Sequence, residues 1–138
     1  MKVLQIQEQG INISNENIQK NAQIEIGVAP LLLVRKDEDT FGLLLKVLYR
    51  VGGNEVILDY DLLTVFAEEN WKAVAPKEEN ALTPKAKPIV SEALSHAIDG
   101  LRAALAVRLT NTKLEGLVLP MMPAEEVLAN LRIRILNQ

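Results

Sequence analysis

The chain has 138 residues, a net charge of −3 at pH 7 and no cysteine. Its length predicts one domain over residues 1–138 whose core is stable without disulfide or metal cross-links. The missing thiols exclude disulfides and thiolate metal sites, and the mildly acidic balance argues against nucleic acid as a partner. The N-terminal stretch lacks the apolar core of a secretory signal, and no run approaches the ~18 apolar residues of a membrane span, so we expect a cytoplasmic protein without membrane contact.

Two strands are predicted before residue 40. The apolar phase of Val3–Ser14 changes from even to odd positions at Gly10, which indicates a β-bulge. Gln23–Val34 alternates as a second strand, and Pro30 within it favours an edge or a kink because proline cannot donate to a ladder. The charged residues 35–39 are typical of a hairpin loop.

Residues 40–51 and 55–67 predict two longer strands joined by a turn at Gly52-Gly53-Asn54. All odd positions from Phe41 to Val51 are apolar, so they predict the core face. The opposite face is also partly apolar, which is unexpected for a sheet with one core. We therefore expect this second face to be covered by another subunit or a client polypeptide. Its apolar residues include Leu44, Leu48, Ile57, Leu63 and Val65.

Helices are predicted in the second half of the chain. After a long connection over 68–87, a stripe at helical spacing from Val90 to Leu109 predicts a long helix beginning near Pro88. Pro123 and the acids after it favour a short second helix, although the alternation over residues 131–135 fits a terminal strand instead. The fold class is thus α+β, with a four-stranded antiparallel sheet followed by a long helix and a short C-terminal helix.

Several segments resemble the bacterial export-chaperone family SecB. Gln5-Ile6-Gln7 is similar to the start of that family's first strand, and residues 12–16 resemble its Asp-Ile-Ser-Phe-Glu segment. Residues 56–66 can be laid on the family's fourth strand without a gap, and Leu119-Pro120 resembles the segment before its last helix.

The resemblance implies a dimer of dimers whose long helices are buried between subunits, and a groove that holds unfolded polypeptide. The expected interface residues are Val90, Leu94, Ile98, Leu101 and Leu105. The expected polypeptide-binding residues are Leu44, Leu48, Leu63, Val65, Trp71 and Leu128. The family's docking sites for a translocase motor fall on Glu16, Ile57 and Asp59, and on Asn12, where the family has an acid.

Each candidate also has a simpler interpretation. The helix stripe can pack on the chain's own sheet, Trp71 can be a lid over the core, and Asp59 and Asp61 fit a solvated face better than a metal or acid–base site. The single histidine, His96, fits a surface position, because a catalytic triad with the nearby serines would need separate elements. Arg132 and Arg134 fit either an anion site or a solvated edge.

These patterns favour a binding protein over an enzyme. We expect an ATP-independent holdase, SecB-like and homo-oligomeric, that uses no cofactor or metal. Its apolar groove would hold non-native polypeptide, and pairing with a sheet edge would add affinity. The alternative is a scaffold or assembly protein that binds one fixed protein partner through the same apolar sheet face.

Overall fold

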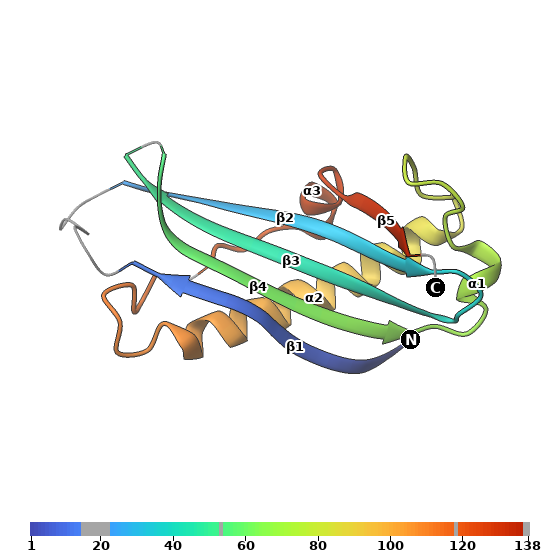
Figure 1. Cartoon of the computed structure of the whole chain (residues 1–138), viewed down its shortest axis with the longest axis horizontal. Helices are drawn as coiled ribbons and strands as arrows, with labels where there is room; N and C mark the ends of the chain where they lie inside the picture. The colour runs from blue at the N-terminus through green and yellow to red at the C-terminus, as the bar shows by residue number, and fades with distance from the viewer. Residues whose placement is uncertain (15–22, 53, 118, 137–138) are drawn as a thin grey trace.

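A computed structural model describes residues 1–14, 23–52, 54–117 and 119–136. Within them a sheet is followed by helices and a last strand (Figure 1). The elements are β1 (Lys2–Ile13), β2 (Ile24–Arg35), β3 (Thr40–Val51), β4 (Glu55–Ala67), α1 (Trp71–Val74), α2 (Ala86–Arg108), α3 (Ala124–Leu128) and β5 (Arg132–Leu136).

The sheet has five strands in the order β1-β4-β3-β2-β5, which corrects the predicted four-stranded antiparallel sheet. The first four strands pair antiparallel, whereas β5 runs parallel to β2 with Arg132 opposite Leu31. The alternation over residues 131–135 is therefore a strand, and the sheet is mixed. Pro30 lies just before Leu31, where the pairing with β5 begins, so the first half of β2 faces β3 alone.

The predicted strands and their breaks are confirmed. β3 and β4 have the expected bounds, and the turn between them begins at Gly52, whose φ is +61°. The register of β1 against β4 shifts between Glu8 and Gly10, where the apolar phase changes along the sequence. A second shift between Val3 and Gln5 leaves Leu4 unpaired, which re-aims its side chain.

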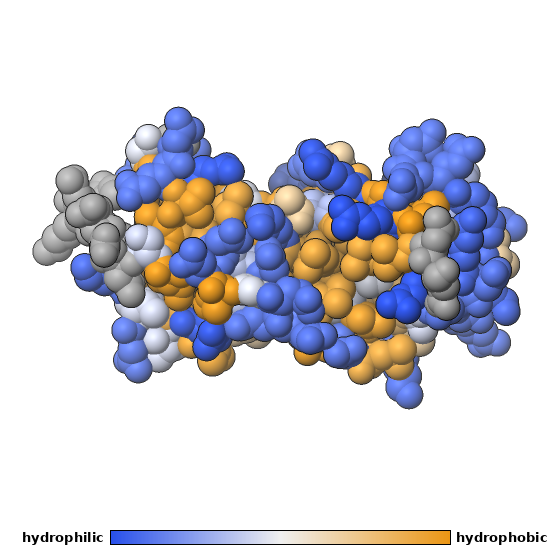
Figure 2. Space-filling model, viewed as in Figure 1, coloured by the Kyte–Doolittle hydropathy of each residue, from blue (hydrophilic) through white to orange (hydrophobic). Residues whose placement is uncertain are grey.

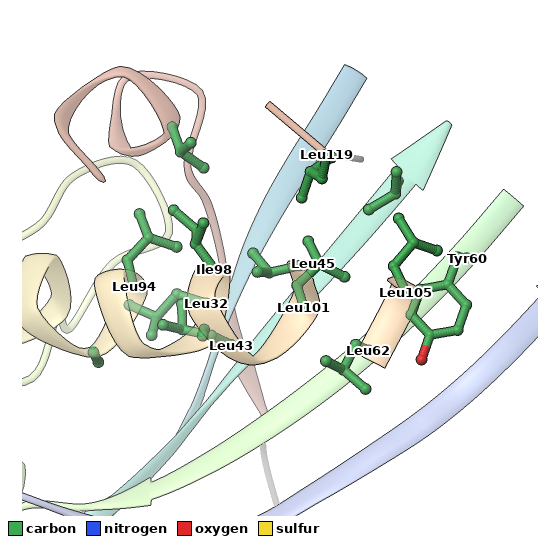
Figure 3. Close-up of a cluster of buried hydrophobic side chains, with 14 of the residues drawn as sticks. Leu32, Leu43, Leu45, Tyr60, Leu62, Leu94, Ile98, Leu101, Leu105 and Leu119 are labelled. Carbon is green, nitrogen blue, oxygen red and sulfur yellow. The ribbon is translucent and has the colours of Figure 1, made fainter. Parts of the chain in front are cut away.

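The core lies between one face of the sheet and α2 (Figure 1). The stripe of α2 meets the odd positions of β3 and the even positions of β2 and β4, because strand side chains alternate between faces. Figure 3 shows leucines of both layers pointing toward one another. The buried side chains at this contact include Leu32, Leu43, Leu45, Tyr60, Leu62, Leu94, Ile98, Leu101 and Leu105.

Aromatic side chains close one end of this core. The ring of Trp71, in α1, lies 4.3 Å from that of Phe41, which stacks on Phe66 at 5.4 Å between centroids. Trp71 is completely buried. The connection that follows is tied to both helices by Thr83, whose hydroxyl donates to the Val74 carbonyl at 2.6 Å and accepts from the Ala86 N–H at 3.1 Å. Thr83 thus serves the start of α2 as a cap.

Candidate functional site

The face of the sheet opposite α2 carries a group of half-buried aliphatic side chains. Leu63, Leu44 and Leu31 are register partners across β4, β3 and β2, and Val65, Gly42 and Leu33 form the next row. Leu4 of β1 lines a hollow together with Leu33, Leu63 and Val65 and is 50% exposed. Figure 2, which looks onto this face, shows apolar surface interrupted by hydrophilic residues. We call the set the outer apolar patch: Leu4, Leu31, Leu33, Leu44, Leu63 and Val65.

A trough crosses the patch at Gly42. A β-carbon at this position would lie 3.2 Å from Leu63 Cδ1 and 3.6 Å from Leu33 Cβ, so these two side chains pack close to the bare backbone, which forms part of the floor of a hollow. The hollow has a volume of about 310 Å³ and is also lined by Leu4, Val65 and both ends of the β2–β3 hairpin loop. Glycine in a central strand is unfavourable for the sheet, so this position marks a close approach or a binding surface.

A charged band bounds the patch along the strands. Lys46 Nζ lies 3.3 Å from Asp59 Oδ1 and 3.7 Å from Asp61 Oδ1, with all three side chains partly exposed. Lys46 of the neighbouring strand thus compensates one of the two carboxylate charges. The arrangement is that of a solvated ion-pair cluster, which contributes little to stability.

A second hollow of about 550 Å³ adjoins the patch on the β5 side. Its apolar lining comes from β2 and β3 and includes Leu31 and Leu44 of the outer apolar patch. Its polar lining includes Arg132 and Arg134 of β5, which are exposed register partners of Leu31 and Leu33. The patch is therefore flanked by cations on one side and by Gln5 and Gln7, hydrogen-bonded to each other at 3.0 Å, on the other.

Three of the six predicted polypeptide-binding residues come together, namely Leu44, Leu63 and Val65. Leu48 lies on the same face but beyond the Lys46 band, next to Asp59. Trp71 is in the core, where it offers no surface to a peptide, and this is the lid that the sequence also allowed. Leu128 is half-buried in α3 and packs against the core. Of the six predicted polypeptide-binding residues, only Leu44, Leu63 and Val65 thus lie together on the outer face of the sheet.

The predicted docking and interface residues are placed as follows. Asp59 and Asn12 are register partners on the outer face, whereas Ile57 is buried to 2% exposure, and Glu16 lies outside the described residues. Val90, Leu94, Ile98, Leu101 and Leu105 are buried against the chain's own sheet. Their burial is accounted for within one chain, and the subunit contact expected of them stays a prediction.

Sequence reasoning missed half of the outer apolar patch and its floor. Leu31 and Leu33 belong to the run Leu31-Leu32-Leu33-Val34, and an uninterrupted apolar run indicates a strand covered on both faces. Leu4 reaches the patch only because of the bulge beside it. The signal for Gly42 was present as well, because a glycine interrupts the apolar residues of a central strand.

The titratable groups give no catalytic arrangement among the described residues. None of them gather into a metal-binding group of three or more His, Asp or Glu, and His96 is exposed on α2. The tyrosines are perturbed, but they lie on the helix side. Burial raises the pKa of Tyr49, whose hydroxyl donates to the Leu117 carbonyl at 3.0 Å. Burial and the neighbouring Glu8 carboxylate raise the pKa of Tyr60 to about 12, opposed by Arg108.

The two edges of the sheet differ in how open they are. β1 forms one edge and carries two register shifts, which weaken it as a pairing template. β5 forms the other, and its Ile135 N–H donates to Glu79 Oε2 at 2.8 Å. This carboxylate occupies a position that an added strand would need. The face of the sheet is therefore more accessible than its β5 edge.

Comparison with known proteins decides the kind of fold. No protein-family model and no curated protein matches the sequence. Among solved structures, the chain is similar to the Mycobacterium tuberculosis Rv1957 SecB-like chaperone in complex with a ChAD peptide from the Rv1956 HigA1 antitoxin, with a TM-score of 0.56, 16% identity and 88% of each chain covered. The chain has the fold of a SecB-like chaperone. The SecB-like architecture expected from the short sequence matches is thereby confirmed. Within the described part of the chain, no helix combines the length and apolarity that crossing a bilayer requires.

Proposed function

We propose that this SecB-like protein binds extended, non-native polypeptide on the outer apolar patch and releases it without nucleotide hydrolysis. The observation that carries the proposal is the patch itself, which lies open on a sheet whose other face is already filled by α2. A surface of this kind marks an interaction site. The similar SecB-like chaperone was solved with a peptide from another protein, which supports a polypeptide as the ligand class.

The size of the patch indicates its affinity. Burying an aliphatic side chain completely stabilises by roughly 1.5–3 kcal/mol. Because five of the six side chains are already more than half buried, covering the rest contributes on the order of a few kcal/mol. Apolar contact alone therefore gives weak and adaptable binding, as a holdase requires, and tighter complexes need polar contacts as well.

Aggregation assays test the proposal. We expect stoichiometric amounts of the protein to suppress light scattering by several unrelated proteins diluted from denaturant. A Leu44→Ser/Leu63→Ser variant should lose most of this effect, because both substitutions place hydroxyls in the patch. Leu48→Ser serves as the matched control, since Leu48 lies on the same face beyond the Lys46 band. No suppression by the native protein at a stoichiometric ratio would refute the holdase role.

The fixed-partner scaffold is the second candidate. It is favoured by the fact that the similar chaperone was solved with a peptide from a single antitoxin. Purification from cell extract distinguishes the two functions. A scaffold would be recovered in one complex of constant composition, whereas a holdase would be recovered with a mixture of unfolded chains.

A further inference from the structure

We infer that the polypeptide segments bound by the outer apolar patch are apolar stretches that carry acidic side chains, and that Arg132 and Arg134 select them. The inference rests on the proposed function and adds the charge of the ligand to it. From the sequence alone, these arginines fit either an anion site or a solvated edge.

The charges around the patch are unequally compensated. On the β4 side, Asp59 and Asp61 are both within ion-pair distance of Lys46. On the β5 side, Arg132 and Arg134 are exposed and make no ion pair with any residue that the structure describes. Glu79, the acid that hydrogen-bonds to β5, accepts from the Ile135 N–H. Around the second hollow, Arg132, Arg134 and Lys46 therefore outnumber Asp59 and Asp61 by one positive charge.

The spacing of the arginines fits an extended chain. Arg132 and Arg134 are two residues apart on one face of β5, so their α-carbons are about 7 Å apart. Leu31 and Leu33 repeat this spacing on β2, and Leu44 and Gly42 repeat it on β3. Side chains two apart in an extended segment have the same period. A segment that lies along these strands can place apolar side chains over the leucines and acidic ones over the arginines.

The negative net charge of the chain does not prevent the binding of acidic segments. The whole protein carries −3, which repels acidic segments at long range. At physiological ionic strength the screening length is about 8 Å, so the two adjacent guanidinium groups dominate the interaction with a bound carboxylate. Arginine also presents a planar donor fork that matches a carboxylate in a bidentate manner. The local chemistry thus favours acids although the protein is acidic.

Binding of three matched peptides tests the inference. Fluorescent peptides of about ten residues, long enough to span the strands, share serine at the even positions and leucine at three odd positions. They differ at the two remaining odd positions, spaced two apart, which carry Glu, Gln or Lys on the same face as the leucines. At about 50 mM salt we expect the Glu peptide to bind roughly tenfold more tightly than the Lys peptide, with the Gln peptide between them. At about 500 mM salt the ratio should fall to roughly twofold.

Two double variants separate the arginines from the general charge of the protein. Arg132→Gln/Arg134→Gln should bind all three peptides about as well as the native protein binds the Gln peptide. Arg50→Gln/Lys87→Gln removes the same charge from exposed residues away from the patch, and it should keep the preference. Thermal unfolding confirms that both variants fold.

The outcomes distinguish the inference from the proposed function. Equal binding of the three peptides, a preference for the Lys peptide, or a Glu preference that survives in the Arg132→Gln/Arg134→Gln variant would overturn the inference while leaving polypeptide binding in place. If none of the peptides binds and aggregation is not suppressed, both the proposed function and the inference fail.

Discussion

Tyr60 joins three elements at one end of the core and makes stability depend on pH. Its ring is buried beside Leu62 and Leu105, while Glu8 and Arg108, paired at 3.1 Å, link β1 to the end of α2 near its hydroxyl. Burial and the Glu8 carboxylate raise the pKa of Tyr60 to about 12, from 10.0 in an unfolded chain. Both effects disfavour the phenolate in the folded protein.

The free energy of unfolding should therefore fall as the pH rises from about 10 to about 12. Below this range both states keep the phenolic proton, whereas within it the unfolded chain loses the proton first. A raised pKa of this size lowers the free energy of unfolding by roughly 2–3 kcal/mol at pH 12. Denaturant unfolding of the native protein and Tyr60→Phe over this range measures the difference, because the other groups titrate in both. Equal slopes with pH for the two proteins would show that Tyr60 is not the responsible group.

At the level of elements, the prediction succeeded where the pattern was local and long. β3 and β4 were predicted with their observed bounds, because 12 or 13 largely alternating residues and a Gly-Gly-Asn turn define both strands, whereas the register shift between Tyr49 and Arg50 was not predicted. The stripe of α2 was also recognised from its period. What the stripe packs against was left open, since a monomer core and a subunit contact require the same apolar residues.

The missed elements depend on contacts between distant parts of the chain. β5 has five residues, and it pairs with β2 about a hundred residues earlier, so its alternation alone could not distinguish a strand from an extended tail. The placement of Trp71 depends on Phe41 across the core. In the same way, the outer apolar patch combines residues of β1, β2, β3 and β4, of which only those on β3 and β4 had a clear two-faced pattern.

The strand faces also allow a test of the trough that leaves the fold intact. Gly42→Ala places a methyl group on its floor, 3.2 Å from the flexible end of Leu63, and we expect the Glu peptide to bind about threefold more weakly because the apolar trough becomes shallower. Gly27→Ala is the control, since it lies on the outer face of β2 with no atom within 4 Å of the new β-carbon.

Gly27→Ala should raise the free energy of unfolding by roughly 0.4–1 kcal/mol, because alanine restricts the unfolded chain. The free energy of unfolding should rise less for Gly42→Ala, since Leu63 has to move to make room for the methyl group. Peptide anisotropy and urea unfolding measure the two quantities separately. Unchanged peptide binding by Gly42→Ala would place the ligand elsewhere on the molecule.

For the whole molecule, the surface that remains apolar predicts where self-association occurs. The stripe of α2 is used within the chain, but Val3 and Ile6 on the helix side of β1 are 45% and 57% exposed, and Val107 of α2 is 73% exposed. The pair Glu8–Arg108 brings the middle of β1 next to the end of α2, so these side chains lie on one side of the molecule. A stable dimer buries about 800 Å² per partner, which requires this region to be covered together with neighbouring surface.

We expect light scattering after size exclusion to give at least twice the chain mass of 15.3 kDa. Ile6→Asp/Val107→Asp should shift the protein toward the single-chain mass, because a buried carboxylate without a partner opposes association. Val56→Asp is the control, as Val56 is 41% exposed near the start of β4, six residues before Leu62, the register partner of Glu8. A single-chain mass for the native protein at every concentration would contradict self-association. Peptide binding would be unaffected by that result, because the outer apolar patch is complete within one chain.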